Sequence, residues 1–343
     1  MNRILSKHDL DGVLITSPHN LRYFTGFSGG EGAAVITADS RELFVDGRYT
    51  FQAKTQAPGF NVTEYHGNIF EYVSRLGLSK IGFEEQYITY YDFARLAKAC
   101  GAKLVPVSSL VEPLRAVKTD EEIRYTKIAE EIGDKAFDHI LQYIKPGVTE
   151  REIAAEIDYF MKRNGADDTS FDTIAAFGER SALPHAFPTN AKLKEGEFVL
   201  MDYGCKYNGY CSDMTRTVCC GKASDEQRKI YELVLKAQLS ALEMLKSGIR
   251  GKDADKAARD IFAEKEVSEN FKHSLGHGTG LLIHEQPNLS PSSETVLEKN
   301  MTVTIEPGLY FEGEFGVRIE DLTVIADDGV LNLTQSEKRL IEL

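Results

Sequence analysis

The dipeptide Asn208-Gly209 constrains the fold of this chain more than any other short feature of its sequence. It separates two strand-like segments, residues 198–204 and 211–220. Asn-Gly between two such segments is the strongest short-range signal for a two-residue β-hairpin turn. The surrounding chain is therefore predicted to form an antiparallel sheet whose register is fixed by that turn.

Two acidic residues lie in this hairpin, although acids are depleted in strands and costly to bury without a partner. The turn places Asp202 opposite Thr215, and Asp213 shares the face of Thr215 because side chains alternate between the faces of a strand. Asp213 is then the diagonal neighbour of Asp202. Two like charges this close imply either a bound cation or a protonated carboxyl group.

A second hairpin with a second pair of acids is predicted in TIEPGLYFEGEFGVRIED, residues 304–321. A three-residue loop in the middle of this segment places Glu306 opposite Glu320. The Pro-Gly dipeptide at 307–308 leaves the register open, since it can introduce a bulge. Arg318 lies on the face of Glu320, where it is placed to brace a carboxylate.

A histidine can add a further metal ligand to the two acid pairs. Three histidines lie in FKHSLGHGTGLLIHE (271–285), where glycines on both sides of His277 permit close approach of a ligand to the backbone. Each acid or histidine alone has an ordinary explanation, as a solvated turn residue or an interior histidine. Five together in β-rich segments favour a metal site, and one imidazole with four carboxylates suits Mn²⁺, Co²⁺ or Fe²⁺ better than structural zinc. The candidate donors are Asp202, Asp213, His277, Glu306 and Glu320.

Strand and helix patterns divide the chain into two parts. Residues 1–115 alternate short apolar strands with helical segments, which predicts a mixed α/β domain. At Thr119 the motif T-D-E-E predicts a capping box, in which Glu122 reaches back to the cap of a helix that continues to about Ile144. Residues 119–343 then combine β-rich segments with further helices, so we expect an α+β domain with a sheet covered by helices.

Composition limits the partners and the compartment. The net charge of -13 argues against a nucleic-acid partner, because binding to phosphates needs clustered cations. Five cysteines, an odd number, do not suggest a disulfide framework and fit a reducing compartment. The first residues lack an apolar stretch typical of a signal peptide, and no run approaches the roughly 20 apolar residues that span a bilayer. These features predict a cytoplasmic protein without a membrane partner.

Several motifs resemble those of a known group of enzymes. MDYG…YCSDMTRT, HSLGHGTG…IHE, TIEPGLY and GVRIED are similar to motifs of the pita-bread metallopeptidases, the superfamily of methionine aminopeptidase, proline dipeptidase (prolidase) and Xaa-Pro aminopeptidase. LRYFTGFSG and FVDGRYT resemble the creatinase-type N-terminal domain, which methionine aminopeptidases lack. The resemblance covers essentially the whole chain. It implies a creatinase-like domain followed by a pita-bread catalytic domain, a curved antiparallel sheet covered by helices.

The resemblance also assigns roles to the candidate residues. It implies that all five donors hold two divalent ions, with Asp213 and Glu320 bridging them, and that Glu306 is also the proton shuttle. His185 and His284 correspond to catalytic histidines that stabilise an oxyanion. The substrate-binding residues that it implies are His185, His273, His284 and Arg318. Mn²⁺ is the first candidate for the metal, with Co²⁺, Fe²⁺ and Zn²⁺ as alternatives.

The activity expected from the resemblance is that of an Xaa-Pro aminopeptidase, a dinuclear-metal exopeptidase that hydrolyses the bond between an N-terminal residue and a following proline. The main alternative is a prolidase that acts only on Xaa-Pro dipeptides. An Arg318 that clamps a terminal carboxylate favours the dipeptidase, whereas an Arg318 that braces Glu320 leaves longer peptides acceptable. A metal-free creatinase-like hydrolase and a non-catalytic peptide-binding module are less favoured, because all five donors are present. The expected partners are small peptides with proline in second position and, by the same resemblance, a second copy of the chain in a homodimer.

Overall fold

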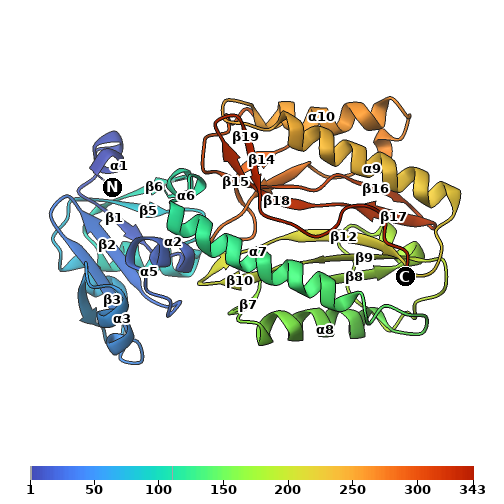
Figure 1. Ribbon diagram of the computed structural model, residues 1–343. Coiled ribbons are helices and arrows are strands. Elements are labelled where there is room, and N and C mark those ends of the chain that lie inside the picture. The colour runs from blue at the N-terminus through green and yellow to red at the C-terminus, as the bar shows by residue number, and fades with distance from the viewer. Residues whose placement is uncertain (1, 110) are drawn as a thin grey trace. The chain divides into compact units, whose positions relative to one another are not determined.

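The computed structural model describes residues 2–109 and 111–343 (Figure 1). They form two compact units, which meet in the sequence between Leu114 and Arg115. Among the helices of these residues, none is both long enough and apolar enough to cross a membrane.

The first unit is built on one mixed sheet of six strands, in the order β4-β3-β2-β1-β5-β6. The central pairs β1/β2 and β2/β3 are antiparallel, and the outer pairs are parallel. The strands are β1 (Gly12–Ile15), β2 (Ala33–Thr37), β3 (Arg41–Val45), β4 (Asn61–Glu64), β5 (Lys80–Glu84) and β6 (Lys103–Val107). The helices are α1 (Asn2–His8), α2 (Pro18–Thr25), α3 (Thr50–Gln56), α4 (Ile69–Ser74) and α5 (Tyr90–Ala99), and α6 (Glu112–Ala116) spans the boundary in the sequence.

The mixed α/β architecture of this unit agrees with the alternating pattern of the sequence. Strand β4 departs from that pattern, because its residues NVTE are exposed or half-buried. An edge strand of this kind pairs on one side only, here with β3, and lacks the apolar run by which a buried strand is recognised.

The second unit begins with α7 (Asp120–Ile140), whose predicted capping box is present. Thr119 Oγ1 accepts a hydrogen bond from the Glu122 backbone N–H at 3.3 Å, and Glu122 Oε2 accepts one from the Thr119 N–H at 2.7 Å. The prediction for the end of this helix was wrong, because it ends earlier. Gln142 and Tyr143 donate to carbonyls three residues before them, which tightens the chain into turns.

The helices of this unit lie in pairs with strands between them (Figure 1). In one pair α7 contacts α8 (Glu150–Arg163), and in the other α9 (Asp225–Met244) contacts α10 (Gly251–Ala263). The strands before α9 are β7 (Asp168–Thr169), β8 (Ile174–Phe177), β9 (Phe198–Tyr203), β10 (Cys205–Tyr207), β11 (Tyr210–Cys211) and β12 (Met214–Cys219). Those after α10 are β13 (Gly276–Gly278), β14 (Glu285–Leu289), β15 (Thr302–Ile305), β16 (Gly308–Phe311), β17 (Phe315–Arg318), β18 (Asp321–Ala326) and β19 (Gly329–Asn332).

The first hairpin has the predicted register. Asn208 and Gly209 both have positive φ, 50° and 76°, as a type I′ turn requires. The ladder of β9 and β12 places Asp202 opposite Thr215. The prediction made from the Asn-Gly turn is therefore confirmed along the whole hairpin.

The second hairpin keeps its predicted register but is interrupted at the acid pair. β16 pairs with β17, and β15 pairs with β18, in the same register on both sides of the interruption. Between these ladders the Glu306 N–H donates to Leu275 O at 2.8 Å, and the Glu320 N–H donates to Thr215 O at 3.1 Å. The backbone of each acid is thus bound to a neighbouring segment, which ties this hairpin to the first one.

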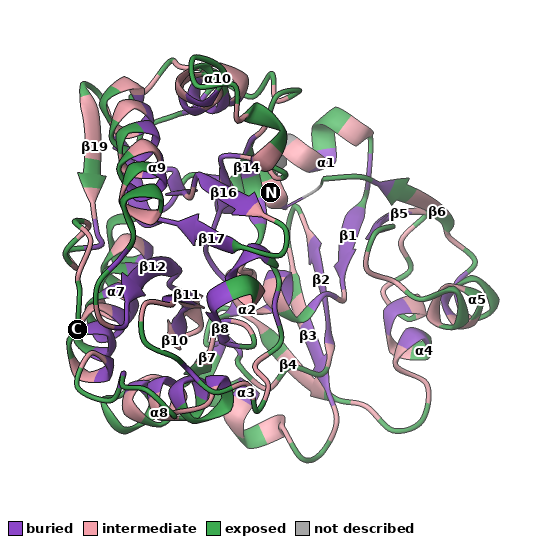
Figure 2. Ribbon diagram, turned by 90° about the vertical axis from the view of Figure 1, so that its right-hand side faces the viewer, coloured by how far each residue is buried: buried purple, intermediate pink, exposed green. Residues whose placement is uncertain are grey.

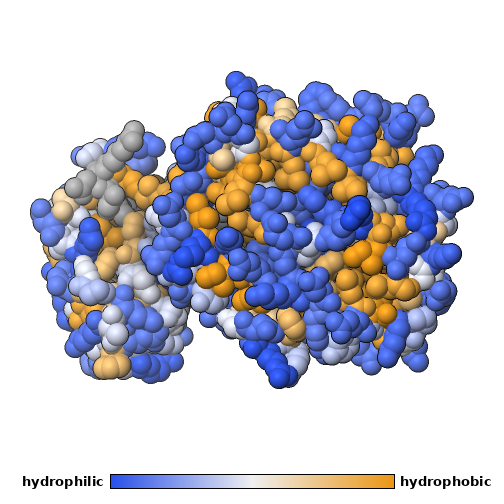
Figure 3. Space-filling view, in the orientation of Figure 1, coloured by the Kyte–Doolittle hydropathy of each residue, from blue (hydrophilic) through white to orange (hydrophobic). Residues whose placement is uncertain are grey.

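Helices cover the strands through two hydrophobic cores. One core joins buried residues of α9 and α10 to β15, β16 and β17, and the other joins α7 and α8 to β8, β9 and β12. Figure 2 shows the strands largely buried, while the helices alternate buried and exposed residues. On the face of the larger unit drawn in Figure 3, hydrophobic residues lie in several groups among hydrophilic ones. All five cysteines are buried and free, in keeping with their odd number.

Candidate active site and metal centre

The five candidate metal ligands converge on one cavity of about 530 Å³ in the second unit. Asp202 comes from β9, and Asp213 immediately precedes β12. His277 lies on β13, Glu306 follows β15, and Glu320 immediately precedes β18. The polar residues set into otherwise apolar strands of the two hairpins therefore face the same space.

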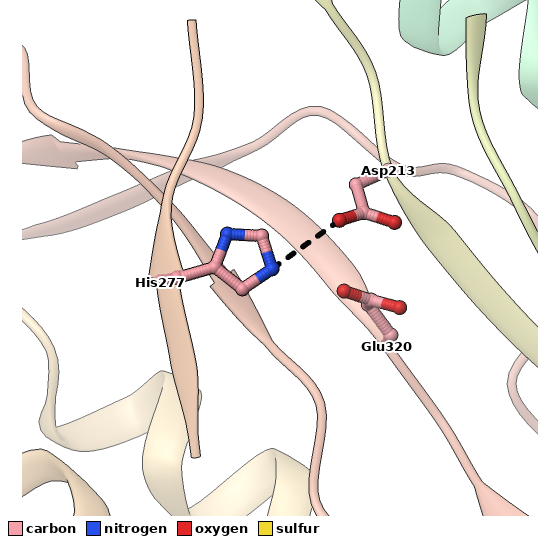
Figure 4. Close-up of side chains that lie close together, drawn as sticks. All are labelled: Asp213, His277 and Glu320. Carbon is pink, nitrogen blue, oxygen red and sulfur yellow. Dashed lines mark ion pairs between the residues drawn. The ribbon is translucent and has the colours of Figure 1, made fainter. Parts of the chain in front are cut away.

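Asp213, His277 and Glu320 form the tightest group within this set (Figure 4). Each offers one ligand atom, and these atoms lie within 4.8 Å of one another. His277 Nε2 is 3.4 Å from Asp213 Oδ2 and also 3.4 Å from Glu306 Oε1. Four of the five predicted donors are thus within reach of a single ion or a pair of ions.

The tautomer of His277 bears on what this group can hold. Its Nδ1 lies 3.1 Å from Gly278 O, which can only accept, so Nδ1 carries the proton of the neutral ring. Burial lowers the pKa of His277 to about 4. The lone pair of Nε2 therefore points toward the carboxylates of Asp213 and Glu306, an arrangement that a cation between them would stabilise.

Two buried carboxylate oxygens in the cavity lack a hydrogen-bond partner among the described residues, Asp202 Oδ1 and Glu320 Oε1. The second oxygen of each is bound: Arg318 donates to Asp202 Oδ2 at 2.5 Å, and Thr215 Oγ1 donates to Glu320 Oε2 at 2.6 Å. A buried carboxylate oxygen without a donor is costly. The donor set and these unbound oxygens therefore fit divalent cations.

The pKa values of the carboxyl groups also indicate that the site fits divalent cations. Burial, and next the charge of Glu320, raises the pKa of Asp213 well above its usual value. Burial, together with neighbouring carboxylates, also raises the pKa of Glu320, and burial raises that of Glu306 to about 8. Crowded carboxyl groups in a low-dielectric site stay protonated unless positive charge is supplied. A divalent ion supplies that charge and restores the ionised ligands.

The three candidate substrate-side histidines line the cavity as well. His185 is exposed, and the ring of His284 packs edge-on against His277 with centroids 4.3 Å apart. His273 differs, because both of its ring nitrogens are bound within the protein. Nδ1 donates to Ser274 O at 2.8 Å, and Nε2 accepts from the Tyr310 hydroxyl at 2.8 Å. Its ring therefore positions neighbouring groups rather than offering a free nitrogen to a ligand.

Arg318 is only 2% exposed, and its guanidinium is held by the protein on all sides. Nε donates to Thr215 Oγ1 at 3.0 Å, and the two terminal nitrogens donate to Asp202, to the Tyr310 hydroxyl at 2.7 Å and to Pro184 O at 3.3 Å. It thus braces Asp202 directly, and it reaches Glu320 through the Thr215 hydroxyl. The sequence analysis expected a contact with a carboxylate but did not identify Asp202 as the partner.

Three residues that support the site were missed by the sequence analysis. Thr215 and Tyr310 bind Arg318, and buried Glu130 accepts from the Asp213 backbone N–H at 3.3 Å. Thr215 carried a usable signal, since the hairpin register already placed it opposite Asp202. Glu130 carried none, because an acid on a helix is ordinarily exposed.

Comparison with known proteins identifies the family. Residues 124–327 match the model of metallopeptidase family M24, and residues 1–117 match that of the creatinase/prolidase N-terminal domain. The chain belongs to metallopeptidase family M24. It is a hydrolase, and its catalytic unit has the pita-bread fold. The resemblance inferred from the sequence motifs is therefore confirmed.

Individual relatives match this M24 peptidase along nearly its whole length. It is 39% identical to an Xaa-Pro dipeptidase of Pyrococcus horikoshii, covering 98% of this chain and 96% of the relative. Among solved structures, an Xaa-Pro dipeptidase from Bacillus anthracis is 43% identical with a TM-score of 0.98, covering 100% of this chain and 98% of that one. An X-Pro aminopeptidase from Thermotoga maritima is 37% identical with a TM-score of 0.93, covering 99% and 100%.

Proposed function

We propose that this M24 peptidase is an Xaa-Pro aminopeptidase, which removes an N-terminal residue that precedes proline. Its solved relatives include enzymes named for both forms of Xaa-Pro hydrolysis, a dipeptidase and an aminopeptidase. The observation that carries the proposal is the convergence of four carboxylates and one imidazole on a single cavity, where two buried oxygens have no donor in the part of the chain that the structure describes.

Two divalent ions, most favourably Mn²⁺, would be held by Asp202, Asp213, His277, Glu306 and Glu320, with Asp213 and Glu320 shared between the ions. These ligands are hard oxygen donors with a single imidazole, the set that suits Mn²⁺ better than structural zinc. When bound, such ions lower the pKa of water and polarise a carbonyl.

Glu306 would act as the general base and then as the general acid. Its Oε1 accepts from Thr304 Oγ1 at 3.2 Å, which orients the carboxyl group toward the cavity that it lines. A carboxylate here can take the proton of the attacking water and return it to the proline nitrogen as the peptide bond breaks. This return is needed, because the nitrogen of a broken Xaa-Pro bond leaves as an amine.

His284 and His185 would donate hydrogen bonds to the oxygen on which negative charge develops. Both line the cavity, and His284 lies directly against His277. Burial lowers the pKa of His284, so the neutral ring is favoured and its N–H is the donor.

Proline fits the rest of the cavity. An Xaa-Pro bond is a tertiary amide without an N–H, so the enzyme has to recognise the ring by shape and the N-terminal residue by its charge. Phe171, Ile174 and Ile283 provide apolar lining for the ring. The two ions would largely offset the charge of the four carboxylates, and a free amino terminus would pair with the negative charge that remains.

Arg318 favours the aminopeptidase over the dipeptidase. A strict dipeptidase needs a cation for the carboxylate of the substrate, and Arg318 is the one lysine or arginine among the described residues that line the cavity. Its donors are used by Asp202, Thr215, Tyr310 and Pro184. Nothing in this arrangement requires that the peptide end at proline.

A matched panel of peptides with Mn²⁺ tests the proposal: Xaa-Pro, Xaa-Pro-Xaa, Xaa-Ala-Xaa and Met-Ala-Ser. We expect cleavage of Xaa-Pro-Xaa with little cleavage of Xaa-Ala-Xaa, and loss of activity after chelation that Mn²⁺ restores. Cleavage of Xaa-Pro alone would favour the prolidase, and preference for Met-Ala-Ser would exclude both. Activity that survives complete removal of metal would favour the creatinase-like alternative, and absence of hydrolysis would favour the binding module. Light scattering of the same sample tests the proposed homodimer.

A further inference from the structure

An exposed phenylalanine lies at the mouth of the active-site cavity. Phe187 lines this cavity, yet its side chain is 75% exposed. It belongs to the segment Leu183–Pro188, which carries His185 and includes one further exposed apolar side chain, Leu183 at 48%. A large aromatic side chain left in water beside a binding cavity forgoes the stabilisation that burial would give.

The backbone of this segment is fixed even though the Phe187 side chain is in solvent. Arg318 donates to Pro184 O at 3.3 Å, and Arg180 donates to Phe187 O at 2.8 Å. The Thr189 N–H donates to Oε2 of the fully buried Glu150 at 2.8 Å. The ring of Phe187 is therefore presented from a rigid support, so little conformational entropy is lost when a ligand packs against it.

The direction of a bound peptide follows from the proposed function. In that function the amino terminus of the peptide would lie next to the carboxylates of the site, with the scissile carbonyl beside them. The residue after proline must then continue toward the open side of the cavity, where the exposed Phe187 ring lies. With this direction a dipeptide would end before the ring, whereas a longer peptide would pass it.

We propose that Phe187 determines specificity for the residue that follows proline, and that it favours aromatic and large aliphatic side chains at that position. This inference rests on the proposed Xaa-Pro aminopeptidase activity and extends it by one subsite. Aromatic side chains pair with apolar or aromatic partners in offset or edge-on geometry. The contact would cover a surface of Phe187 that is otherwise exposed to water.

The test compares Ala-Pro-Phe with Ala-Pro-Gly, two peptides that differ only in the side chain after proline. For the wild-type enzyme with Mn²⁺ we expect kcat/KM to be about tenfold higher for Ala-Pro-Phe than for Ala-Pro-Gly. A ratio of this size corresponds to the binding free energy that one aromatic contact contributes. Phe187→Ala should bring this ratio close to one, and Phe187→Leu should keep part of it. Leu183→Ala is the matched control: it removes an exposed apolar side chain of the same segment that does not line the cavity, and should keep the ratio.

Three results would overturn the inference. The first is a wild-type ratio near one, or a ratio that Phe187→Ala leaves unchanged, while both peptides are still cleaved; the proposed function then stands. The second is a change in oligomeric state in Phe187→Ala, measured by light scattering, which would make Phe187 part of an interface between copies. The third is cleavage of Ala-Pro without either tripeptide, which would overturn the aminopeptidase proposal as well.

Discussion

Arg318 donates to Asp202 across 2.5 Å, and the two side chains are only 3% and 13% exposed. The charge of Arg318 opposes the effect of burial, which raises the pKa of Asp202. Residues 2–109 and 111–343 supply no donor for the other oxygen, Asp202 Oδ1, and Asp202 lines the cavity. An arginine that orients one carboxylate in this way controls how that carboxylate can meet a cation.

Arg318→Lys should therefore weaken the site even though the charge is kept. Lysine is a point charge, so it cannot reproduce the separate contacts to Asp202, Thr215 and Tyr310. We expect Mn²⁺ affinity and kcat/KM to fall about 10- to 100-fold. Titration of the metal-free enzyme with Mn²⁺ measures the first quantity, and Arg339→Lys, a change at an exposed arginine, is the control. Unchanged Mn²⁺ affinity in Arg318→Lys would show that the Arg318–Asp202 contact does not support the metal site.

The proposed bridging residues should behave differently from a terminal ligand. Asp213→Asn or Glu320→Gln removes a charge that both ions would share, so the affinity for both ions should fall. Asp202→Asn should lower mainly the affinity for one of them. Metal content per chain, measured by elemental analysis after gel filtration, distinguishes the two patterns. Full metal content and activity in both bridging variants would refute the assignment.

Glu306→Gln should lower turnover by about 10² to 10⁴, because glutamine keeps the shape of the side chain but cannot accept the proton of the attacking water. Glu306 is also a proposed ligand, so metal content has to be measured in the same samples. The comparison is made at saturating Mn²⁺, where the wild type and the variant both carry their full complement of metal. A fully loaded variant that turns over at the wild-type rate would assign the general base to another group.

A second buried arginine, Arg216, contributes to the stability of the fold. Arg216 is fully buried and donates to Asp321 at 2.8 Å, and it also binds Glu320 O at 2.5 Å. Arg216→Met should lower the free energy of unfolding by about 3–5 kcal/mol, because it leaves a buried carboxylate with less compensation. Arg339→Met removes an exposed ion pair with Glu337 and should change the free energy of unfolding far less. Equal midpoints of the two variants in urea unfolding would contradict this difference.

Local sequence signals predicted much of the site. The Asn208-Gly209 turn fixes the register of its hairpin, so the position of Asp202 opposite Thr215 follows from period-two alternation alone. The capping box at Thr119 likewise depends only on residues close in sequence. The roles of individual ligands came from the resemblance to the family and not from these signals.

Long-range pairings could not be predicted in this way. Arg318 and Asp202 are far apart in the sequence, and alternation placed Arg318 on the face of Glu320 without indicating which acid it binds. The interruption between the ladders of the second hairpin also escaped prediction, because it depends on Thr215 of the first hairpin and on Leu275 accepting backbone hydrogen bonds. Contacts of this kind are decided by how sheets pack, which no local pattern encodes.

Metal affinity should fall as the pH decreases from 8 to 6. Burial raises the pKa of Glu306 to about 8 in the metal-free protein, and the pKa values of Asp213 and Glu320 lie well above their usual range. Above the pKa of Glu306 its carboxyl group is ionised and loses no proton when metal binds, whereas below it the metal has to displace a proton. The Kd for Mn²⁺ should then rise up to about tenfold per pH unit for each proton displaced.

His277 does not explain such a dependence, because its pKa of about 4 keeps the ring neutral throughout this range. Equilibrium dialysis with Mn²⁺ at pH 6, 7 and 8 measures the slope directly. Glu306→Gln should show a shallower slope than the wild type, since one displaced proton is absent. A Kd that stays constant over this range would mean that the carboxyl groups are already ionised before metal binds, and that the neighbouring positive charge of Arg318 outweighs their burial.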